Sequence, residues 1–330
     1  MKISFFSSQA YDISFFEKVN TKYKHELTFH DFTLNENTVD SIEDVVCICV
    51  FVNDKLTATV LNKLYLKGVR LIALRCAGFN NIDLTVADEL GITVVRVPAY
   101  SPESVAEHAI GLMLSLSRHI HRAYNRVRES NFSLDGLLGF ELHHATVGIV
   151  GTGQIGTVLA KILIGFGSKV IAYDPYPSNE CEALGINYVD FKTLCQQANI
   201  ISLHCPLTTE THHLINTSTL QDMKQDVMLI NTSRGAVIDT QAVILALKNK
   251  QVGYLGLDVY EQEENLFFKD RSNEIISDDM FERLLTFPNV LITGHQAFFT
   301  DQALTNIAET TLNNIQRFEN NTECIHCCHI

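Results

Sequence analysis

The sequence has no apolar run that approaches the roughly 18 residues a membrane-spanning helix needs. Its first residues form only a short apolar patch, and Asp12 follows soon after, so they lack the longer apolar core of a secretion signal. There is also no repeat of solenoid length and no low-complexity segment. We therefore expect a folded protein of the cytosol with no membrane partner.

Basic residues are scarce relative to acidic ones. The 330 residues include 25 Lys and Arg against 38 Asp and Glu, a formal net charge of -13. Such a surface repels phosphate backbones, and the basic residues form no dense stripe, so we expect no nucleic-acid partner. Small anions remain possible, because one buried Arg can bind a carboxylate against an unfavourable overall field.

The nine cysteines are scattered and do not form the regular pairs of a disulfide framework. Several lie in apolar runs, as Cys47, Cys49 and Cys76 do, and we expect them to be small core residues. The motif CIHCCH at 324–329 is unrepeated and lacks a second ligand pair at zinc-finger spacing. We expect a frayed tail there and no metal site.

Apolar runs and helical patterns alternate along the chain, which predicts parallel sheets with helices on their faces. The length allows two such domains. The predicted strands of the first are 2–7, 26–32, 45–52, 69–77 and 93–97, with helical patterns at 54–66 and 82–90. The predicted strands of the second are 145–150, 169–173, 200–203, 227–231, 254–257 and 290–293.

Two long helices are predicted outside this alternation. Residues 101–129 are expected to form a single helix, because Ser101 suits the N-cap, Pro102 suits the first turn and only Gly111 interrupts the pattern. Residues 301–318 are expected to form the last helix. The pattern does not show against which sheet this last helix packs.

A glycine-rich motif, GTGQIG at 151–156, stands directly after an apolar strand and opens a helical pattern. Gly151 permits a tight turn, Gly153 lets the backbone approach a pyrophosphate, and Gly156 allows close helix–strand packing. The N-terminus of the helix offers N–H groups to phosphates. The alternative is an incidental glycine-rich turn in an α/β domain.

The end of the next strand supports a dinucleotide site. Asp174 lies 18 residues after Gly156, near the roughly 20-residue offset of the acidic residue that binds the adenosine ribose. A carboxylate there repels the 2′-phosphate of NADP. The motif therefore predicts NAD as the cofactor.

Three kinds of side chain that 2-oxo acid chemistry needs follow later strands. Arg234 can hold a carboxylate bidentately, and His295 suits general acid–base work. A carboxylate beside that imidazole would stabilise its protonated form, and Glu261, Glu263 and Glu264 are all candidates. The alternatives are a surface arginine and a structural histidine.

Several motifs together make the chain resemble the D-specific 2-hydroxyacid dehydrogenase family, most closely its fermentative D-lactate dehydrogenases, over almost its whole length. The motifs are LRCAGFNNID at 74–83, RVPAYSP at 96–102, VAEHA at 105–109, the glycine-rich turn, HCPLT at 204–208, NTSRG at 231–235, GLDVYE at 256–261 and GHQAF at 294–298.

The resemblance implies a fold and an activity. The fold is two Rossmann-like or flavodoxin-like parallel-sheet domains: a discontinuous catalytic domain, 1–100 with 299–330, and an inserted NAD-binding domain, 101–298. The activity is reversible reduction of pyruvate to D-lactate by NADH, in a homodimer or homotetramer. The alternatives are a sibling enzyme for larger 2-oxo acids or glyoxylate, and a non-enzymatic NAD-sensing regulator.

The resemblance also assigns roles to single residues. It makes Arg234 the substrate clamp, His295 the acid/base and Glu263 the partner of that imidazole. The residues it places near the substrate are Ala77, Gly78, Tyr100 and Phe298. The residues it places near the cofactor are Gly151, Gly153, Gln154, Ile155, Gly156, Asp174, Cys205, Pro206, Thr211, Thr232, Ser233 and Asp258, the last at the nicotinamide carboxamide.

Overall fold

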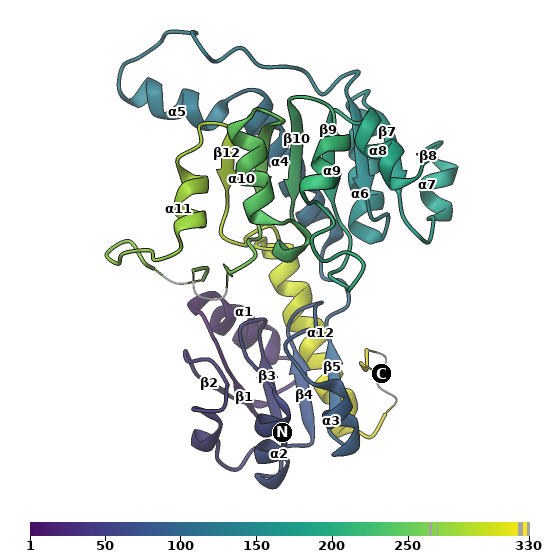
Figure 1. Cartoon of the computed structure of the whole chain (residues 1–330). Coiled ribbons are helices and arrows are strands. Elements are labelled where there is room, and N and C mark those ends of the chain that lie inside the picture. Colours follow the sequence, from purple (N-terminus) through teal and green to yellow (C-terminus); the bar gives the residue numbers. More distant parts are fainter. Residues whose placement is uncertain (264–265, 269, 323–325, 329–330) are drawn as a thin grey trace. The chain divides into compact units, whose positions relative to one another are not determined.

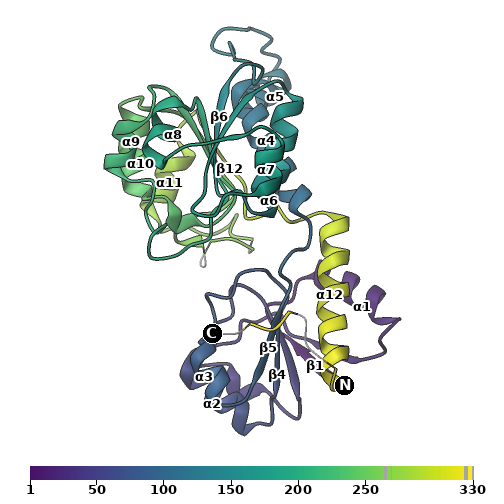
Figure 2. The ribbon, with the colours of Figure 1, turned by 90° about the vertical axis from the view of Figure 1, so that its right-hand side faces the viewer.

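The computed structural model describes residues 1–263, 266–268, 270–322 and 326–328. The chain divides into two compact units: unit 1 is Met1–Ser101 with Phe299–Ile330, and unit 2 is Pro102–Phe298. Each unit has one parallel sheet with helices on both of its faces (Figures 1 and 2). This confirms the predicted fold class of two parallel-sheet α/β domains, the first of them discontinuous.

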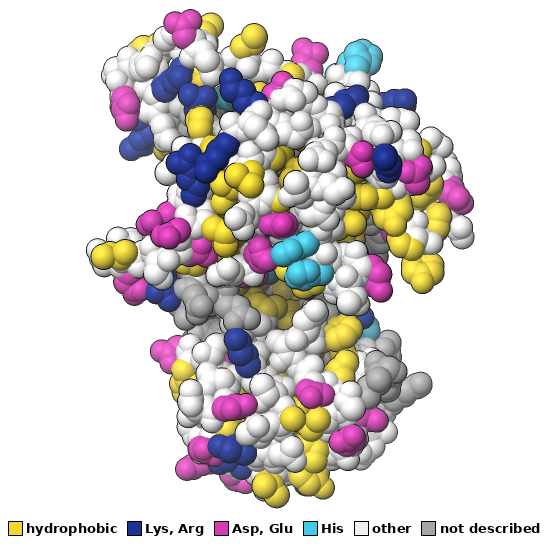
Figure 3. Space-filling model, in the orientation of Figure 1, with side chains coloured by type: hydrophobic (Ala, Val, Ile, Leu, Met, Phe, Trp, Pro, Cys, Tyr) yellow, Lys and Arg dark blue, Asp and Glu magenta, His cyan; other side chains and the backbone are white. Residues whose placement is uncertain are grey.

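No helix among the described residues is long and apolar enough to cross a membrane. On the face drawn in Figure 3, acidic and basic side chains are interspersed.

Unit 1 contains a five-stranded sheet. Its strands are β1 (Lys2–Phe5), β2 (Glu26–Phe29), β3 (Cys47–Val50), β4 (Leu71–Leu74) and β5 (Thr93–Arg96). Its helices are α1 (Ala10–Asn20), the short η1 (Val39–Ser41), α2 (Ala58–Leu66), α3 (Leu84–Glu89) and α12 (Asp301–Glu319). The strand order β2-β1-β3-β4-β5 is that of flavodoxin-like sheets. Figure 2 shows α2 and α3 on one face and α1 and α12 on the other.

The strands β3 and β4 are buried at every residue, with the sequences CICV and LIAL. A strand of a parallel sheet that is covered on both faces has a continuous apolar run, because neither face meets water. Cys47 and Cys49 are fully buried and Cys76 nearly so, which confirms their prediction as core residues.

A buried polar network ties together the loops at the carboxyl end of this sheet. Arg75 follows β4 and is 1% exposed. Its Nε lies 3.2 Å from Asp12 Oδ1, and its Nη2 donates to the Ser7 carbonyl at 2.9 Å. Asp54 accepts hydrogen bonds from Ser7 Oγ and from the Leu34 N–H. Removal of one partner would leave a buried charge uncompensated, so the network holds these loops in place.

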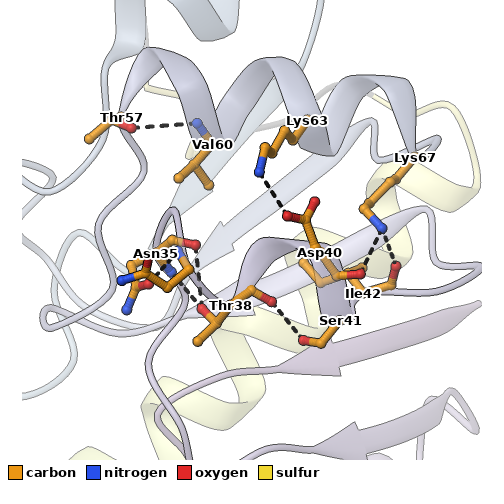
Figure 4. Close-up of polar contacts among 10 residues, drawn as sticks. Asn35, Thr38, Asp40, Ser41, Ile42, Thr57, Val60, Lys63 and Lys67 are labelled. Atoms are coloured by element: carbon orange, nitrogen blue, oxygen red, sulfur yellow. Dashed lines mark hydrogen bonds and ion pairs between the residues drawn. The ribbon is translucent and has the colours of Figure 1, made fainter.

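The short helix η1 is fastened to α2 by two lysines (Figure 4). Lys63 Nζ lies 2.8 Å from Asp40 Oδ2. Lys67 Nζ donates to the carbonyls of Asp40 and Ile42 at 3.0 and 2.9 Å. The ion pair is exposed and stabilises the fold little, but the two carbonyl contacts fix the direction of the loop that leads into β3.

Unit 2 contains a seven-stranded parallel sheet. Its strands are β6 (Thr146–Val150), β7 (Lys169–Tyr173), β8 (Asn187–Tyr188), β9 (Ile200–Leu203), β10 (Val227–Asn231), β11 (Val252–Leu257) and β12 (Val290–Ile292). Its helices are α4 (Pro102–Ser117), α5 (Ile120–Arg128), α6 (Gln154–Gly165), α7 (Asn179–Ala183), α8 (Phe191–Gln197), α9 (Thr217–Asp222), η2 (Gly235–Val237), α10 (Thr240–Lys248) and α11 (Asp279–Leu285).

The strand order of this sheet is β12-β11-β10-β9-β6-β7-β8, so β6 has β7 on one side and β9 on the other. The chain order therefore reverses between β6 and β9. Ligands of open α/β sheets bind beyond the carboxyl ends of the strands at such a reversal. The loops after β6, β9, β10, β11 and β12 all leave from this edge.

The predicted single helix over residues 101–129 is wrong. Helix α4 ends at Ser117 and α5 begins at Ile120, with His119 between them at a φ of +52°. This left-handed conformation is uncommon outside glycine but less so for histidine. The prediction considered only Gly and Pro as interruptions, so it missed the break.

The prediction of a frayed tail is also wrong for the part that the structure describes. Residues 326–328 pair with β5, and Val95 and Cys327 form an antiparallel bridge. Main-chain groups of an edge strand are satisfied by such pairing. Cys324, Ile325 and His329 of the tail motif lie outside the described residues. Among those described, no group of three or more His, Cys, Asp or Glu could hold a metal ion.

Candidate active site

The glycine-rich turn connects β6 to α6. Gly151 has a φ of +95°, and a Cβ there would lie 2.7 Å from the backbone of His204, so this turn packs against the loop after β9. A Cβ on Gly156 would lie 2.0 Å from the Gly151 carbonyl oxygen, which shows how closely α6 approaches the turn. Around Gly153, by contrast, no heavy atom lies within 4 Å of the Cβ position. Gly153 is the N-cap of α6, and Gln154 and Ile155 are its first residues.

Asp174 follows β7 and faces the same turn. Its Oδ2 accepts hydrogen bonds from the Thr152 N–H at 2.6 Å and from Thr152 Oγ1 at 3.2 Å. Its Oδ1 accepts from the Tyr176 N–H at 2.8 Å. Tyr188, from β8, donates to Thr152 Oγ1 at 2.8 Å. These contacts hold the carboxylate beside the glycine-rich turn.

The loop after β9 carries Cys205, Pro206 and Thr211. Cys205 is buried, and burial raises the pKa of its thiol to about 11, so it stays protonated at neutral pH. Thr211 Oγ1 donates to the Pro206 carbonyl at 2.6 Å and accepts from the Thr208 N–H at 2.8 Å. The threonine thus closes a compact turn at the sheet edge.

The loop after β10 carries Thr232, Ser233 and Arg234. Asn231, fully buried at the end of β10, accepts from Ser233 Oγ at 2.9 Å and donates to the Arg234 carbonyl at 2.9 Å. Arg234 Nη1 donates to the Ser233 carbonyl at 2.7 Å. A Cβ on Gly235 would lie 2.1 Å from the carbonyl carbon of Tyr260. The arginine turn is therefore packed against the loop after β11.

The loop after β11 carries Glu263, which is hydrogen-bonded to His295, the candidate acid/base. Glu263 Oε1 lies 2.8 Å from His295 Nδ1, and its Oε2 accepts from the Tyr260 N–H at 2.9 Å. Both side chains are about one-fifth exposed. A proton on Nδ1 is thereby fixed toward the carboxylate, which leaves Nε2 as the nitrogen that can serve a substrate.

The other described candidate carboxylate, Glu261, has a different partner. Its Oε1 lies 2.7 Å from His213 Nε2, and its Oε2 accepts from Thr240 Oγ1 at 2.8 Å. Glu264 lies outside the described residues. Among the described candidates, the structure therefore brings Glu263 to His295.

Asp258 directly follows β11 and anchors the loop that carries His295. The His295 N–H donates to the Asp258 carbonyl at 2.7 Å. The Asp258 carboxylate accepts from the N–H groups of Gln296 and Ala297 at 2.9 and 2.8 Å and from Thr293 Oγ1 at 2.5 Å. Asp258 is fully buried. It positions the histidine loop; a contact to the nicotinamide stays a prediction.

His108 of α4 completes this network. Its Nε2 lies 3.0 Å from Thr293 Oγ1 and 3.3 Å from Asp258 Oδ1. Burial by itself would raise the pKa of Asp258, but the hydrogen bonds from His108, Thr293 and the two N–H groups outweigh it, and the pKa lies below its ordinary value. The carboxylate therefore stays ionised inside the fold.

The residues predicted for the substrate lie in both units. Phe298 of unit 2 is buried, and its ring centroid lies 6.4 Å from that of His295 in an edge-to-face arrangement. In unit 1, Ala77 and Gly78 follow β4, and Tyr100 follows β5. The Ala77 carbonyl accepts from Arg96 and the Tyr100 carbonyl from Asn306 of α12.

Residues 110–297 match the family described as D-isomer specific 2-hydroxyacid dehydrogenase, NAD binding domain. The chain belongs to the D-isomer specific 2-hydroxyacid dehydrogenase family. It is accordingly an NAD-dependent oxidoreductase, and unit 2 contains the NAD-binding domain of this family.

Similar members of the family cover almost the whole chain. A 2-hydroxyacid dehydrogenase homolog of Haemophilus influenzae is 54% identical over 98% of this chain and 98% of that one. A D-lactate dehydrogenase of Escherichia coli is 53% identical over the same shares. The solved apo-structure of D-lactate dehydrogenase from Escherichia coli covers 100% of both chains with 50% identity and a TM-score of 0.91.

The residues of this dehydrogenase fit the cofactor. The open space at Gly153 and the start of α6 suit a pyrophosphate. Thr232 Oγ1 is buried and has no hydrogen-bond partner among the described residues, so it offers a polar group to a ligand at this edge. Asp174 stands at the turn, where the ribose hydroxyls bind in this fold.

Sequence reasoning missed three residues that hold the dehydrogenase site together: Asn231, Gly235 and His108. Asn231 and Gly235 stand within the NTSRG motif, so their place beside Arg234 was a usable signal. His108 lies far away in sequence, and only the fold brings it to Thr293. Its VAEHA motif gave no local indication of that partner.

Proposed function

We propose that this dehydrogenase catalyses the reversible reduction of pyruvate to D-lactate with NADH. The observation that carries the proposal is the 2.8 Å contact between His295 Nδ1 and Glu263 Oε1. These residues follow β12 and β11, and Arg234 follows the adjacent β10, so all three leave the same edge of the sheet. The Escherichia coli relatives are named D-lactate dehydrogenase, which supports D-lactate as the product.

The proposed roles follow from the chemistry of the three side chains. The Arg234 guanidinium binds the carboxylate of the 2-oxo acid and orients its carbonyl. His295 donates its Nε2 proton to the carbonyl oxygen, and Glu263 stabilises the imidazolium by accepting from Nδ1. NADH, when bound, supplies the hydride to the carbonyl carbon. In the reverse direction, His295 accepts the hydroxyl proton.

The remaining site assignments are also proposals. Phe298 limits the space for the substrate side chain, because its ring lies next to that of His295. The Ala77 and Gly78 amides and Tyr100 contribute substrate contacts from unit 1. The residues assigned to NAD are those of the glycine-rich turn (Gly151, Gly153, Gln154, Ile155 and Gly156), with Asp174, Cys205, Pro206, Thr211, Thr232, Ser233 and Asp258.

The test is NADH oxidation by the purified protein with pyruvate, glyoxylate and a series of longer 2-oxo acids, with chiral analysis of the product. The proposal expects the highest kcat/KM on pyruvate and D-lactate as the product. A higher kcat/KM on a bulkier acid would assign the chain to a sibling activity, since one methylene is worth only about 1–3 kcal/mol in such a pocket. NADH binding without turnover on any acid would favour a regulator.

We also propose that the chain forms a homo-oligomer through unit 2. Helix α5 has no buried residue, and Ile120, Tyr124 and Val127 are all more than half exposed on one face of it. Phe132, Leu134 and Leu138 follow with 72–91% exposure. Figure 3 shows apolar side chains among Lys and Arg over this part of unit 2. An apolar set of this kind on a helix is typical of a subunit interface.

A further inference from the structure

The tail segment 326–328 runs beside β5, at the open edge of the unit 1 sheet. The Arg96 N–H donates to the His326 carbonyl at 3.1 Å, and the Cys328 N–H donates to the Val94 carbonyl at 2.8 Å. With the Val95–Cys327 bridge, these bonds make the tail a short antiparallel partner of β5. The backbone of Arg96 is therefore held from the tail side.

Helix α12 binds the carbonyl of the same residue. Asn314 is 2% exposed, and its Nδ2 donates to the Arg96 carbonyl at 3.0 Å. Its Oδ1 lies 3.1 Å from His326 Nδ1. Both main-chain polar groups of Arg96 are thus occupied, and the two elements that occupy them are bonded to each other.

The side chain of Arg96 reaches the turn after β4. Nη1 donates to the Ala77 carbonyl at 2.7 Å, a charge-assisted hydrogen bond. The guanidinium carbon lies 5.1 Å from the centroid of the Phe79 ring. The Cys76 thiol donates to the Gly78 carbonyl at 3.2 Å. The turn is therefore held at two successive carbonyls.

The hydrogen bond to Ala77 determines the orientation of a neighbouring N–H. A peptide unit is planar and trans, so its carbonyl and its N–H point in opposite directions. Because Arg96 holds the Ala77 carbonyl, it also fixes the direction of the Gly78 N–H. A rotation of this peptide would require breaking the charge-assisted bond.

We propose that Arg96 is a positioning residue for the substrate carboxylate, and that the C-terminal tail supports it. Arg96 keeps the Gly78 N–H oriented for an anionic 2-oxo acid, and pairing of residues 326–328 with β5 keeps Arg96 in place. This rests on the proposed function, because only there is Gly78 assigned to the substrate. It gives the Cys- and His-containing tail a role in substrate affinity without any metal.

Two pairs of variants test the role of the Arg96 side chain and the role of the tail separately. Arg96→Met removes the donors but retains the length of the side chain, and Arg96→Lys restores one donor. Cys328→Pro removes the N–H that Val94 accepts, whereas Cys328→Ala keeps it. We expect Arg96→Met to raise the KM for pyruvate at least tenfold, with partial recovery in Arg96→Lys. We expect Cys328→Pro to raise it at least threefold over Cys328→Ala.

Two further measurements complete the test. NADH affinity, followed by its own fluorescence because the sequence has no tryptophan, is expected to be unchanged in all four variants. Hydrogen exchange of the segment 77–80 is expected to be faster in Arg96→Met than in the wild type. It is also expected to be faster in Cys328→Pro than in Cys328→Ala. Unchanged exchange in both variants would overturn the proposal whatever the substrate is.

The same set distinguishes this inference from the proposed function. If the wild type does not reduce pyruvate, the proposed function fails, while the exchange data still decide whether Arg96 and the tail hold the turn. Faster exchange with an unchanged KM on an active enzyme would overturn the link to the substrate. If Arg96→Met does not fold, the Cys328 pair decides the question.

Discussion

At the scale of single residues, His295 combines a strained backbone with a reactive side chain. Its φ of +53° lies in the left-handed region, which costs roughly 1–2 kcal/mol for a residue with a Cβ. The bonds of its N–H to the Asp258 carbonyl and of its Nδ1 to Glu263 hold it there. Other residues outside the site, such as His119, share this conformation, but at the residue proposed for proton transfer such strain is of the kind found in active sites.

The first residue-scale prediction concerns Glu263. In Glu263→Gln the Nδ1 proton loses its charged acceptor, so the imidazole is no longer oriented and stabilised by a carboxylate when it exchanges a proton with the substrate. We expect kcat for reduction to fall by about 10²-fold or more. Steady-state kinetics of wild type and variant measure the effect.

The control for this experiment is Glu261→Gln, because Glu261 pairs with His213 and not with His295. The kcat of this control variant is expected to remain at the wild-type value. A Glu263→Gln variant with the kcat of the wild type would contradict the proposed role of the carboxylate.

The second residue-scale prediction concerns His204. Burial lowers the pKa of His204 to about 4 from 6.5. The unfolded chain therefore binds a proton at His204 near pH 6.5, whereas the folded chain binds it only near pH 4. The free energy of unfolding therefore decreases as the pH is lowered from 6.5 to 4. Between pH 7 and 5 this loss amounts to about 2 kcal/mol.

We expect His204→Gln to lose less stability than the wild type between these two pH values. Urea unfolding followed by circular dichroism at pH 7 and pH 5 measures the difference. His212→Gln, at an exposed histidine of the same unit, is the matched control. Equal losses in wild type and His204→Gln would show that His204 does not titrate in this way.

Residue types and their order along the chain made Arg234 and His295 candidates, because each follows an apolar strand, and the family resemblance then selected them. The choice among the carboxylates was beyond local sequence. It depends on a turn in which Glu263 reaches back to the Tyr260 N–H, while Glu261 turns toward His213. Such a choice is made by tertiary contacts, which no spacing rule contains.

At the scale of elements, the loops after β10 and β11 are packed without space for another atom. A Cβ on Gly235 would lie 2.1 Å from the Tyr260 carbonyl carbon and 2.4 Å from the Glu261 nitrogen. Only glycine allows the arginine turn and the glutamate loop to approach this closely. The position of these two loops relative to each other therefore depends on the absence of a Cβ at Gly235.

We expect Gly235→Ala to separate these loops and to lower kcat/KM by about 10²-fold, since a shift near 1 Å can cost that much. The free energy of unfolding is expected to fall by about 1–3 kcal/mol. Gly165→Ala is the matched control, because no heavy atom lies within 4 Å of its Cβ position. Wild-type activity in Gly235→Ala would show that the loops can move apart without loss.

The elements themselves were predicted unevenly. Long apolar strands were predicted well, since continuous burial leaves a continuous apolar run. The two-residue strand β8 and the break at His119 were not predicted, because neither leaves a periodic pattern. The pairing of the tail with β5 was also missed, because it uses main-chain groups and is independent of the side chains.

At the scale of the whole molecule, the apolar face of α5 bears on assembly. We expect Val127→Asp to lower the molecular mass in solution to that of a smaller species, because a charge on the proposed interface is not tolerated. Light scattering after size-exclusion chromatography measures the mass. Leu66→Asp, at an 83% exposed leucine of unit 1, is the control and should leave the mass unchanged. A wild type that is already monomeric would contradict the proposed interface.

The discontinuity of unit 1 has a consequence for synthesis. Helix α12 packs on α1, β4 and β5, and its buried residues include Leu304, Ile307 and Leu312. Unit 2, residues 102–298, is complete before α12 leaves the ribosome. Domains usually fold in the order of their translation, but here the N-terminal sheet must wait for the last helix. The nascent chain therefore exposes the part of that sheet face which α12 covers until unit 2 has been made, and this is the interval in which a chaperone has most to protect.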